Sequence, residues 1–191
     1  MKIAVFASGT GSNFAAILES IQSKKIMNVE VVLLVSDRPK ALVIQKARDE
    51  RIPVFTFKAN DFPNKQVYEE EILNELTQRE VDFIVLAGYM RLLGPVLLQA
   101  YDGKIINVHP SLLPAFTGKD AIGQALDCGV KVTGVTVHYV DEGMDTGPII
   151  DQRAVTIDPD ETRETLIKKI QEQEHRLLPE VIQNLASRLT F

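Results

Sequence analysis

The stretch that decides the fold is KIAVFASGTGSN, which runs from Lys2 to Asn13. Residues 2–7 form a nearly continuous apolar run, which is typical of a strand covered on both faces of a sheet. The two glycines that follow, with a serine and an asparagine after them, indicate a tight loop that opens a helix. Because backbone N–H groups at such a helix start attract anions, this loop predicts a phosphate-binding site.

The same loop departs from the fingerprint of a dinucleotide site. That fingerprint places a third glycine at position 14, where this chain has Phe14. A single phosphate group therefore fits the loop better than a dinucleotide, for which Asp37 would be the acid that holds a ribose hydroxyl. A turn that binds nothing is the other alternative.

Apolar runs and amphipathic stretches alternate along the chain. The sequence predicts strands at 2–7, 29–36, 54–57, 83–87 and 105–108, and helices at 13–24, 40–50, 64–79 and 95–100. This alternation is typical of an α/β protein with a doubly wound, mostly parallel sheet and helices on both faces. Two β-branched runs at 132–140 and 149–157 predict two more strands. A long C-terminal helix is expected from about Thr162, with Pro179 kinking or interrupting it.

Composition narrows the class of protein further. The 191 residues are 45% hydrophobic and 25% charged, which excludes disorder, collagen and coiled coil and predicts a single domain over 1–191. The net charge of −5 argues against nucleic acid or an anionic membrane as a partner. Cys128 is the sole cysteine, so an intrachain disulfide is excluded. With no run near the roughly 20 apolar residues of a membrane helix, and no signal peptide expected, the prediction is a cytoplasmic protein.

A polar pair closes the fifth predicted strand. Asn107 and His109 lie two residues apart, so they share one face at the carboxyl end of the strand, before Pro110. Ligands bind at that end of the strands in open α/β sheets. An asparagine amide and an imidazole together can stabilise an oxyanion and move a proton. A histidine with a purely structural role is the alternative.

Three acids in the loop between the last two strands could support His109. They are Asp141, Glu142 and Asp145, and on chemistry alone they are equivalent. A carboxylate beside an imidazole stabilises the protonated ring and fixes its tautomer. His138, in the preceding strand, is expected to be a packed strand residue.

Two further positions combine charge with apolar neighbours. Glu174 falls on the apolar stripe of the last helix, so we expect a cation of the protein or an ammonium group of a ligand beside it. Residues 90–93 follow the fourth strand and offer an apolar lip with the Arg91 guanidinium. This combination suits an aromatic ring and a carboxylate.

The stretch NVHPSLLP, from Asn107 to Pro114, resembles the formyltransferase family that uses 10-formyltetrahydrofolate, as does Asp145 in its Gly-x-Asp-x-Gly-Pro run. The resemblance extends from about Lys2 to Arg188, and the opening loop is similar to that of members acting on glycinamide ribonucleotide. It implies a Rossmann-like fold and a cytoplasmic enzyme of purine biosynthesis. This enzyme would move the formyl group of 10-formyltetrahydrofolate to the amine of glycinamide ribonucleotide, giving formylglycinamide ribonucleotide and tetrahydrofolate. The resemblance implies no metal, nucleic acid or membrane partner. The oligomeric state that it implies is a monomer or a homodimer.

The resemblance also assigns residues to the site. The catalytic set is Asn107, His109 and Asp145. The ribonucleotide would be held by Gly11, Ser12 and Asn13 at its phosphate and by Gln171, Glu172, Gln173 and Glu174 at its ribose and amine. The formyl folate would contact Lys65, where relatives often carry arginine, together with Met90, Arg91, Leu92, Leu93, Asn107, Asp141, Glu142, Gly143, Met144 and Asp145. Residues 1–100 would form the half that binds the phosphate substrate, and residues 101–191 the folate-binding and catalytic half.

Two other functions stay open at this point. A formyltetrahydrofolate hydrolase-like enzyme would use the same asparagine, histidine and aspartate. A non-catalytic, doubly wound nucleotide-binding module would show no convergence of Asn107 and His109 with Asp145.

Overall fold

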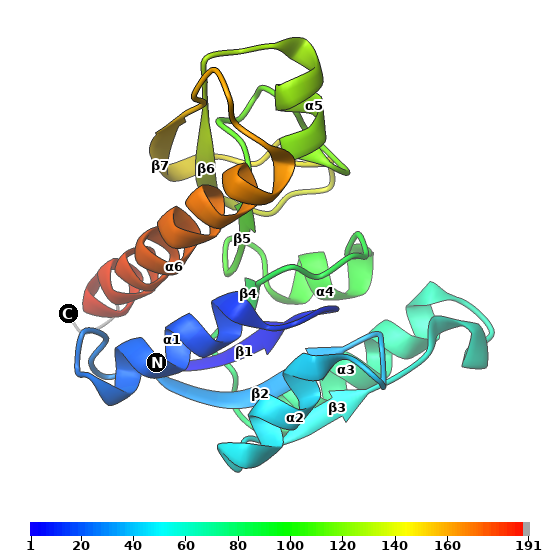
Figure 1. Cartoon of the computed structure of the whole chain (residues 1–191). Helices are drawn as coiled ribbons and strands as arrows, with labels where there is room; N and C mark the ends of the chain where they lie inside the picture. Colours follow the sequence, from blue (N-terminus) through cyan, green and yellow to red (C-terminus); the bar gives the residue numbers. More distant parts are fainter. Residues whose placement is uncertain (189–191) are drawn as a thin grey trace.

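A computed structural model describes residues 1–188, and its backbone is organised around one seven-stranded sheet (Figure 1). The strands are β1 (Lys2–Phe6), β2 (Glu30–Ser36), β3 (Val54–Thr56), β4 (Phe83–Leu86), β5 (Ile105–His109), β6 (Val132–Tyr139) and β7 (Ile149–Thr156). Their order is β3-β2-β1-β4-β5-β6-β7. The first five strands are parallel, whereas β6 pairs antiparallel with β5 and β7 antiparallel with β6. The predicted mostly parallel sheet is therefore confirmed.

The helices alternate with these strands. They are α1 (Ser12–Gln22), α2 (Leu42–Asp49), α3 (Lys65–Gln78), α4 (Pro95–Ala100), α5 (Ala121–Cys128) and α6 (Arg163–Arg188), with a short 3-10 turn, η1 (Ala59–Asp61). The sequence did not predict α5 or η1. Of the two effects expected of Pro179, a kink or an interruption, the interruption was wrong, because α6 continues through Pro179. The buried neighbours Leu178, Val181 and Ile182 offset the backbone hydrogen bond that proline cannot donate.

Two apolar layers cover the sheet, and the alternation of side chains along β1 shows how they divide. Ile3 and Val5 face a cluster that includes α1, α2, α5 and α6. Ala4 and Phe6 face a second cluster, to which α3 and α4 contribute. Every core residue of β1 is buried, as expected for a central strand of a doubly wound sheet.

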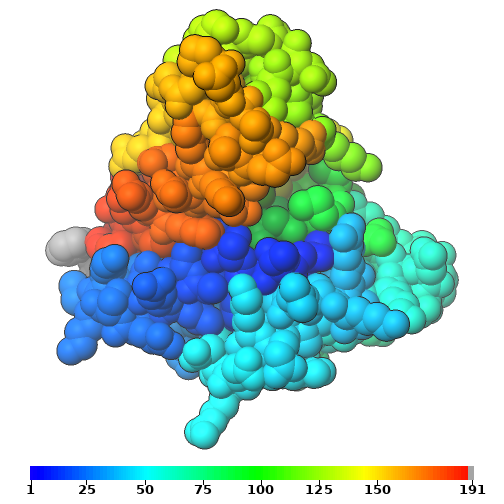
Figure 2. Space-filling model, in the orientation of Figure 1, coloured from blue at the N-terminus to red at the C-terminus, as the bar shows by residue number. Residues whose placement is uncertain are grey.

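The long helix α6 connects the first hundred residues to the last two strands, since it packs against α1 and also against β6 and β7 (Figure 1). In Figure 2 the first hundred residues, blue to cyan-green, form the broad lower part, and the later segments form the narrow top. None of the helices within residues 1–188 has the length and apolar character of a membrane span.

The strand order reverses direction between β1 and β4, because the chain leaves β1 toward β2 on one side and returns to β4 on the other. The carboxyl ends of these two strands are adjacent, and the Ser8 N–H donates to the Gly88 carbonyl over 3.0 Å. Such a switch point is where ligands bind in this class of sheet.

Gly11 connects β1 to α1 in a conformation that favours glycine. Its φ is +72°, and a Cβ there would lie 2.4 Å from Cγ2 of Val43, on α2. We expect Gly11→Ala to lower the free energy of unfolding by about 2–4 kcal/mol, from the left-handed backbone and the overpacking combined.

The matched control is Gly9→Ala, at an exposed glycine whose Cβ would meet nothing within 4 Å. It is expected to change the free energy of unfolding by less than about 1 kcal/mol. Urea unfolding followed by circular dichroism measures both, and an equal loss in the two variants would contradict this account of Gly11.

Candidate active site

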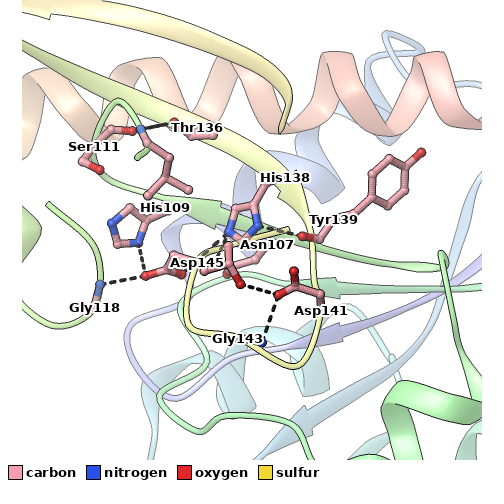
Figure 3. Close-up of polar contacts among 12 residues, drawn as sticks. Asn107, His109, Ser111, Gly118, Thr136, His138, Tyr139, Asp141, Gly143 and Asp145 are labelled. Atoms are coloured by element: carbon pink, nitrogen blue, oxygen red, sulfur yellow. Dashed lines mark hydrogen bonds and ion pairs between the residues drawn. The ribbon is translucent and has the colours of Figure 1, made fainter. Parts of the chain in front are cut away.

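The carboxylate of Asp145 is the meeting point of the site (Figure 3). Its Oδ2 accepts a hydrogen bond from the Gly118 N–H over 2.7 Å and lies 3.4 Å from Nδ1 of His109. Its Oδ1 lies 3.7 Å from Nε2 of His138. The structure thus brings His109, from the end of β5, together with an acid from the loop after β6.

The imidazole of His109 is placed between two oxygen atoms. Nδ1 faces the carboxylate of Asp145, and Nε2 lies 2.8 Å from the Phe116 carbonyl oxygen. Because a carbonyl oxygen can only accept, Nε2 carries a proton and donates it to Phe116. The other nitrogen, Nδ1, is the one that faces the acid.

Asn107 is oriented by a histidine on the neighbouring strand. The β5–β6 register pairs Asn107 with His138, and the Asn107 amide nitrogen lies 3.2 Å from Nε2 of that ring. The other nitrogen, Nδ1, lies 2.8 Å from the Tyr139 carbonyl oxygen, which can only accept. His138 therefore carries its proton on Nδ1, and the Asn107 amide donates to Nε2. Burial lowers the pKa of His138, in keeping with this neutral form.

His138 is the residue whose contacts the sequence did not indicate. It is packed in the sheet, as expected, but it also orients Asn107 and approaches Asp145. The contact could have been predicted only from the antiparallel register of β6 against β5, because that register places His138 opposite Asn107.

The three loop acids have different surroundings. Asp141 accepts hydrogen bonds from the Gly143 N–H over 3.0 Å and from the Thr146 hydroxyl over 2.7 Å, so it shapes the loop itself. Glu142 is exposed. Asp145 is the one whose carboxylate reaches His109.

The segment from His109 to Gly118 is fastened to the sheet by Thr136 of β6. The Thr136 hydroxyl donates to the Ser111 carbonyl over 2.7 Å and accepts from the Leu113 N–H over 3.0 Å (Figure 3). The Leu113–Pro114 peptide bond is cis. These contacts direct the chain so that Gly118 can donate to Asp145.

The glycine loop and α6 form a second polar cluster. Gly11 is the N-cap of α1, and no side chain of residues 1–188 caps that end, so its N–H groups can receive an anion. Asn13, in the first turn, donates to Oε2 of Glu174 over 2.9 Å. Glu174 is buried as predicted, but the expected cation of the protein is not its partner; a neutral amide is. Burial raises the pKa of Glu174 to about 7.

The four residues of α6 assigned to the ribonucleotide lie on two sides of the helix. Gln171 precedes Glu174 by three residues and so lies on the same side. Glu172 and Gln173 instead line a cavity of about 290 Å³ beside β7, together with Lys169.

Residues 90–93, which the resemblance assigns to the folate, lie where the carboxyl ends of the central strands meet. Met90 and Leu92 are exposed, while the Arg91 Nε lies 3.0 Å from Oδ2 of Asp37. Asp37 also accepts from the Ser8 hydroxyl, which counts against its use for a dinucleotide ribose. Lys65 begins α3 and lies near Glu69.

Among residues 1–188, no group of three or more His, Cys, Asp or Glu is placed to hold a metal ion.

The fold and the cluster of Asn107, His109 and Asp145 define a class of protein, and comparison with known proteins identifies that class. The formyl transferase family matches residues 1–182, and the chain belongs to that family. It is 54% identical over 184 residues to phosphoribosylglycinamide formyltransferase of Bacillus subtilis (strain 168), covering 96% of this chain and 94% of that protein. It is 40% identical to the trifunctional purine biosynthetic protein adenosine-3 of Drosophila melanogaster, covering 97% of this chain but 14% of that protein.

Solved structures agree with these relatives. Phosphoribosylglycinamide formyltransferase of Bacillus halodurans aligns with a TM-score of 0.96 at 51% identity, over 99% of this chain and 97% of that one. Glycinamide ribonucleotide transformylase 1 of Geobacillus kaustophilus aligns with a TM-score of 0.94 at 57% identity, over 97% and 98% of the two chains.

The buried Glu174 makes stability depend on pH. Its pKa is about 7 in the folded chain against an ordinary 4.5, so the folded state holds the proton that the unfolded state releases between these values. Stability from this group is therefore present below about pH 4.5 and is lost as the pH rises through about 7. We expect Glu174→Gln to raise the free energy of unfolding at pH 8 by up to about 3 kcal/mol and to change it little at pH 4.5.

Urea unfolding of the wild type and the variant at both pH values measures this difference. The matched control is Glu172→Gln, which removes an exposed acid from the same helix and should show no such pH-dependent gain. A gain for Glu174→Gln that is equal at the two pH values would be inconsistent with the raised pKa.

Proposed function

We propose that this chain transfers the formyl group of 10-formyltetrahydrofolate to the amine of glycinamide ribonucleotide, giving formylglycinamide ribonucleotide and tetrahydrofolate. The observation that carries the proposal is the convergence of Asn107, His109 and Asp145 at the carboxyl end of β5. The likeness to phosphoribosylglycinamide formyltransferases over nearly the full length supports the same substrates. The reaction places the enzyme in purine biosynthesis, and a cytoplasmic location stays a prediction.

The reaction begins when the glycinamide amine attacks the formyl carbon. A carbon–nitrogen bond forms, and the electron pair of the carbonyl group moves to oxygen. The Asn107 amide and the His109 imidazolium donate hydrogen bonds to this oxyanion, and the formyl oxygen takes the place of the Phe116 carbonyl as acceptor for His109. Asp145 stabilises the charged ring throughout.

The intermediate then collapses. The bond between the formyl carbon and N10 of the folate breaks, the carbonyl re-forms, and the proton lost by the amine moves to N10. A water molecule ordered by Asp145 relays this proton. No step calls for a metal ion.

The two substrates would approach from different elements. Gly11, Ser12 and Asn13 would hold the phosphate of the ribonucleotide, with Glu174 and Gln171 near its ribose and amine. The folate ring would lie against residues 90–93 and the 141–145 loop, and Lys65 would meet a carboxylate of the folate tail as a point charge. The division into a phosphate-binding half, 1–100, and a catalytic half, 101–191, stays part of this proposal, with Lys65, residues 90–93 and residues 171–174 contributing across it.

An assay with and without the ribonucleotide tests the proposal. Purified protein is mixed with 10-formyltetrahydrofolate, and loss of the formyl group is followed by absorbance. Turnover that requires glycinamide ribonucleotide is the expected result. Formyl loss that does not need the ribonucleotide would instead assign a hydrolase, in which water replaces the amine, and no loss in either mixture would assign a binding module.

The catalytic set predicts a specific pattern of variants. His109→Ala should lower kcat by about 100- to 1000-fold, because it removes one donor to the oxyanion. Asp145→Asn should fall in the same range, since it removes the charge that stabilises the imidazolium. Steady-state kinetics on both substrates measures these effects.

Asp160→Asn is the matched control for Asp145→Asn, because it makes the same change at an exposed acid between β7 and α6 that is assigned to neither substrate. It should retain near-normal kcat. Near-normal turnover by His109→Ala would refute the assigned role of the imidazole.

A further inference from the structure

We propose that Asp37 and Glu69 are positioning residues for the folate site: two buried carboxylates that hold residues 90–93 from opposite ends. Neither residue belongs to the catalytic set, and neither is among the residues assigned to a substrate. The inference rests on the proposed function, because it takes residues 90–93 as the surface that receives the folate ring.

Asp37 holds the first end. It follows β2, its side chain is 6% exposed, and its Oδ2 accepts from the Arg91 Nε over 3.0 Å. Its Oδ1 accepts from the Ser8 hydroxyl over 2.5 Å, and that hydroxyl oxygen accepts from the Met90 N–H over 2.9 Å. One carboxylate thus joins the carboxyl ends of β1, β2 and β4. The Arg91 guanidinium is bound to Asp37 through Nε and also interacts with the Tyr68 hydroxyl of α3, so its position is fixed from two elements.

Glu69 holds the second end. It lies on α3 with a side chain 2% exposed, and its Oε1 accepts from the Gly94 N–H over 2.6 Å. Gly94 is the N-cap of α4 and has no side chain with which to cap the helix, so Glu69 supplies the carboxylate from α3. The Leu97 N–H, in the first turn of α4, also interacts with this carboxylate. Glu69 therefore holds the start of α4 at two backbone positions.

The close approach at Gly94 ties Lys65 to the same carboxylate. A Cβ at position 94 would lie 2.6 Å from Oε2 of Glu69 and 2.9 Å from Cε of Lys65. The Lys65 ammonium lies 3.9 Å from Oε1 of Glu69. Glu69 therefore sets both the end of the 90–93 segment and the place of a cation that would meet the folate tail.

Between the two anchors the segment exposes apolar surface on a fixed backbone. Met90 is 61% exposed and Leu92 is 56% exposed, although both are large and apolar. A surface that is already ordered binds a flat ring without the entropic cost of ordering it first. Loss of either anchor should therefore weaken binding of the folate and leave binding of the ribonucleotide unchanged.

The test uses variants that keep the shape of each side chain and remove its charge. Asp37→Asn and Glu69→Gln should each raise KM for 10-formyltetrahydrofolate by about tenfold or more, the factor that corresponds to one lost hydrogen bond to a charged group. KM for glycinamide ribonucleotide should stay within about twofold of the wild type, since neither carboxylate is placed in contact with Gly11, Ser12 or Asn13 among the described residues. Hydrogen exchange at the Met90 and Gly94 amides should become faster in Asp37→Asn and Glu69→Gln respectively.

Asp49→Asn and Glu70→Gln are the matched controls. Both are exposed acids that accept a hydrogen bond from a glutamine four residues earlier, Gln45 and Gln66 respectively, and neither should change either KM. Ser8→Ala serves if a carboxylate variant fails to fold, because it removes the bridge from Asp37 to the Met90 N–H and keeps the charge. It should also raise KM for the folate selectively.

Unchanged KM for the folate in folded variants would overturn the inference, and so would equal rises for both substrates, which indicate general loss of the fold. Failure of the wild type to turn over the substrate pair would count against the proposed function instead. In that case the hydrogen exchange of the Met90 and Gly94 amides still decides whether the two carboxylates anchor the segment.

Discussion

The hydrogen bond from the Gly118 N–H to Asp145 is the constraint on which the site depends, because it joins the loop after β5 to the loop after β6. Asp145 reaches it from a backbone with φ of +58°, a strained conformation for a side-chain-bearing residue. The same carboxylate oxygen faces His109, so the contact between the two loops and the placement of the imidazole depend on one oxygen atom. A chain that lost this contact would keep its sheet and lose the relation between its histidine and its acid.

The fold was predictable where the local pattern and the tertiary packing demand the same residues. The central strands are apolar on both faces because helices cover both faces, so β1, β2 and β4 appear in the sequence as continuous apolar runs. Helix α5 was missed because it is short, contains Gly123 and starts after Asp120 in a left-handed conformation. The passage of α6 through Pro179 could not be foreseen either, since it depends on buried packing that the sequence alone does not specify.

The residues of the site were also predictable only where a local pattern relates them. Asn107 and His109 share a face because they are two residues apart in one strand, a relation that needs no tertiary knowledge. The choice of Asp145 over Asp141 depends on the path of a loop, and the contact of His138 with Asn107 depends on an antiparallel register. The burial of Glu174 followed from helical spacing, but its partner Asn13 lies 161 residues away, beyond the reach of any local pattern.

Three carboxylates are buried near the carboxyl ends of the strands, and their polar partners offset the cost of burial to different extents. Asp37 has a guanidinium, and Glu69 has a backbone N–H with an ammonium nearby, whereas Glu174 has only the amide of Asn13 among residues 1–188. The least compensated acid is therefore the one beside the glycine loop, where an anion would bind and would make its ionisation harder still. A ligand that brings a phosphate to the loop and places hydroxyl or amine donors beside Glu174 satisfies both needs at once. Under the proposed function, the ribonucleotide would offset the cost of burying this acid, since it carries a phosphate, hydroxyl groups and an amine.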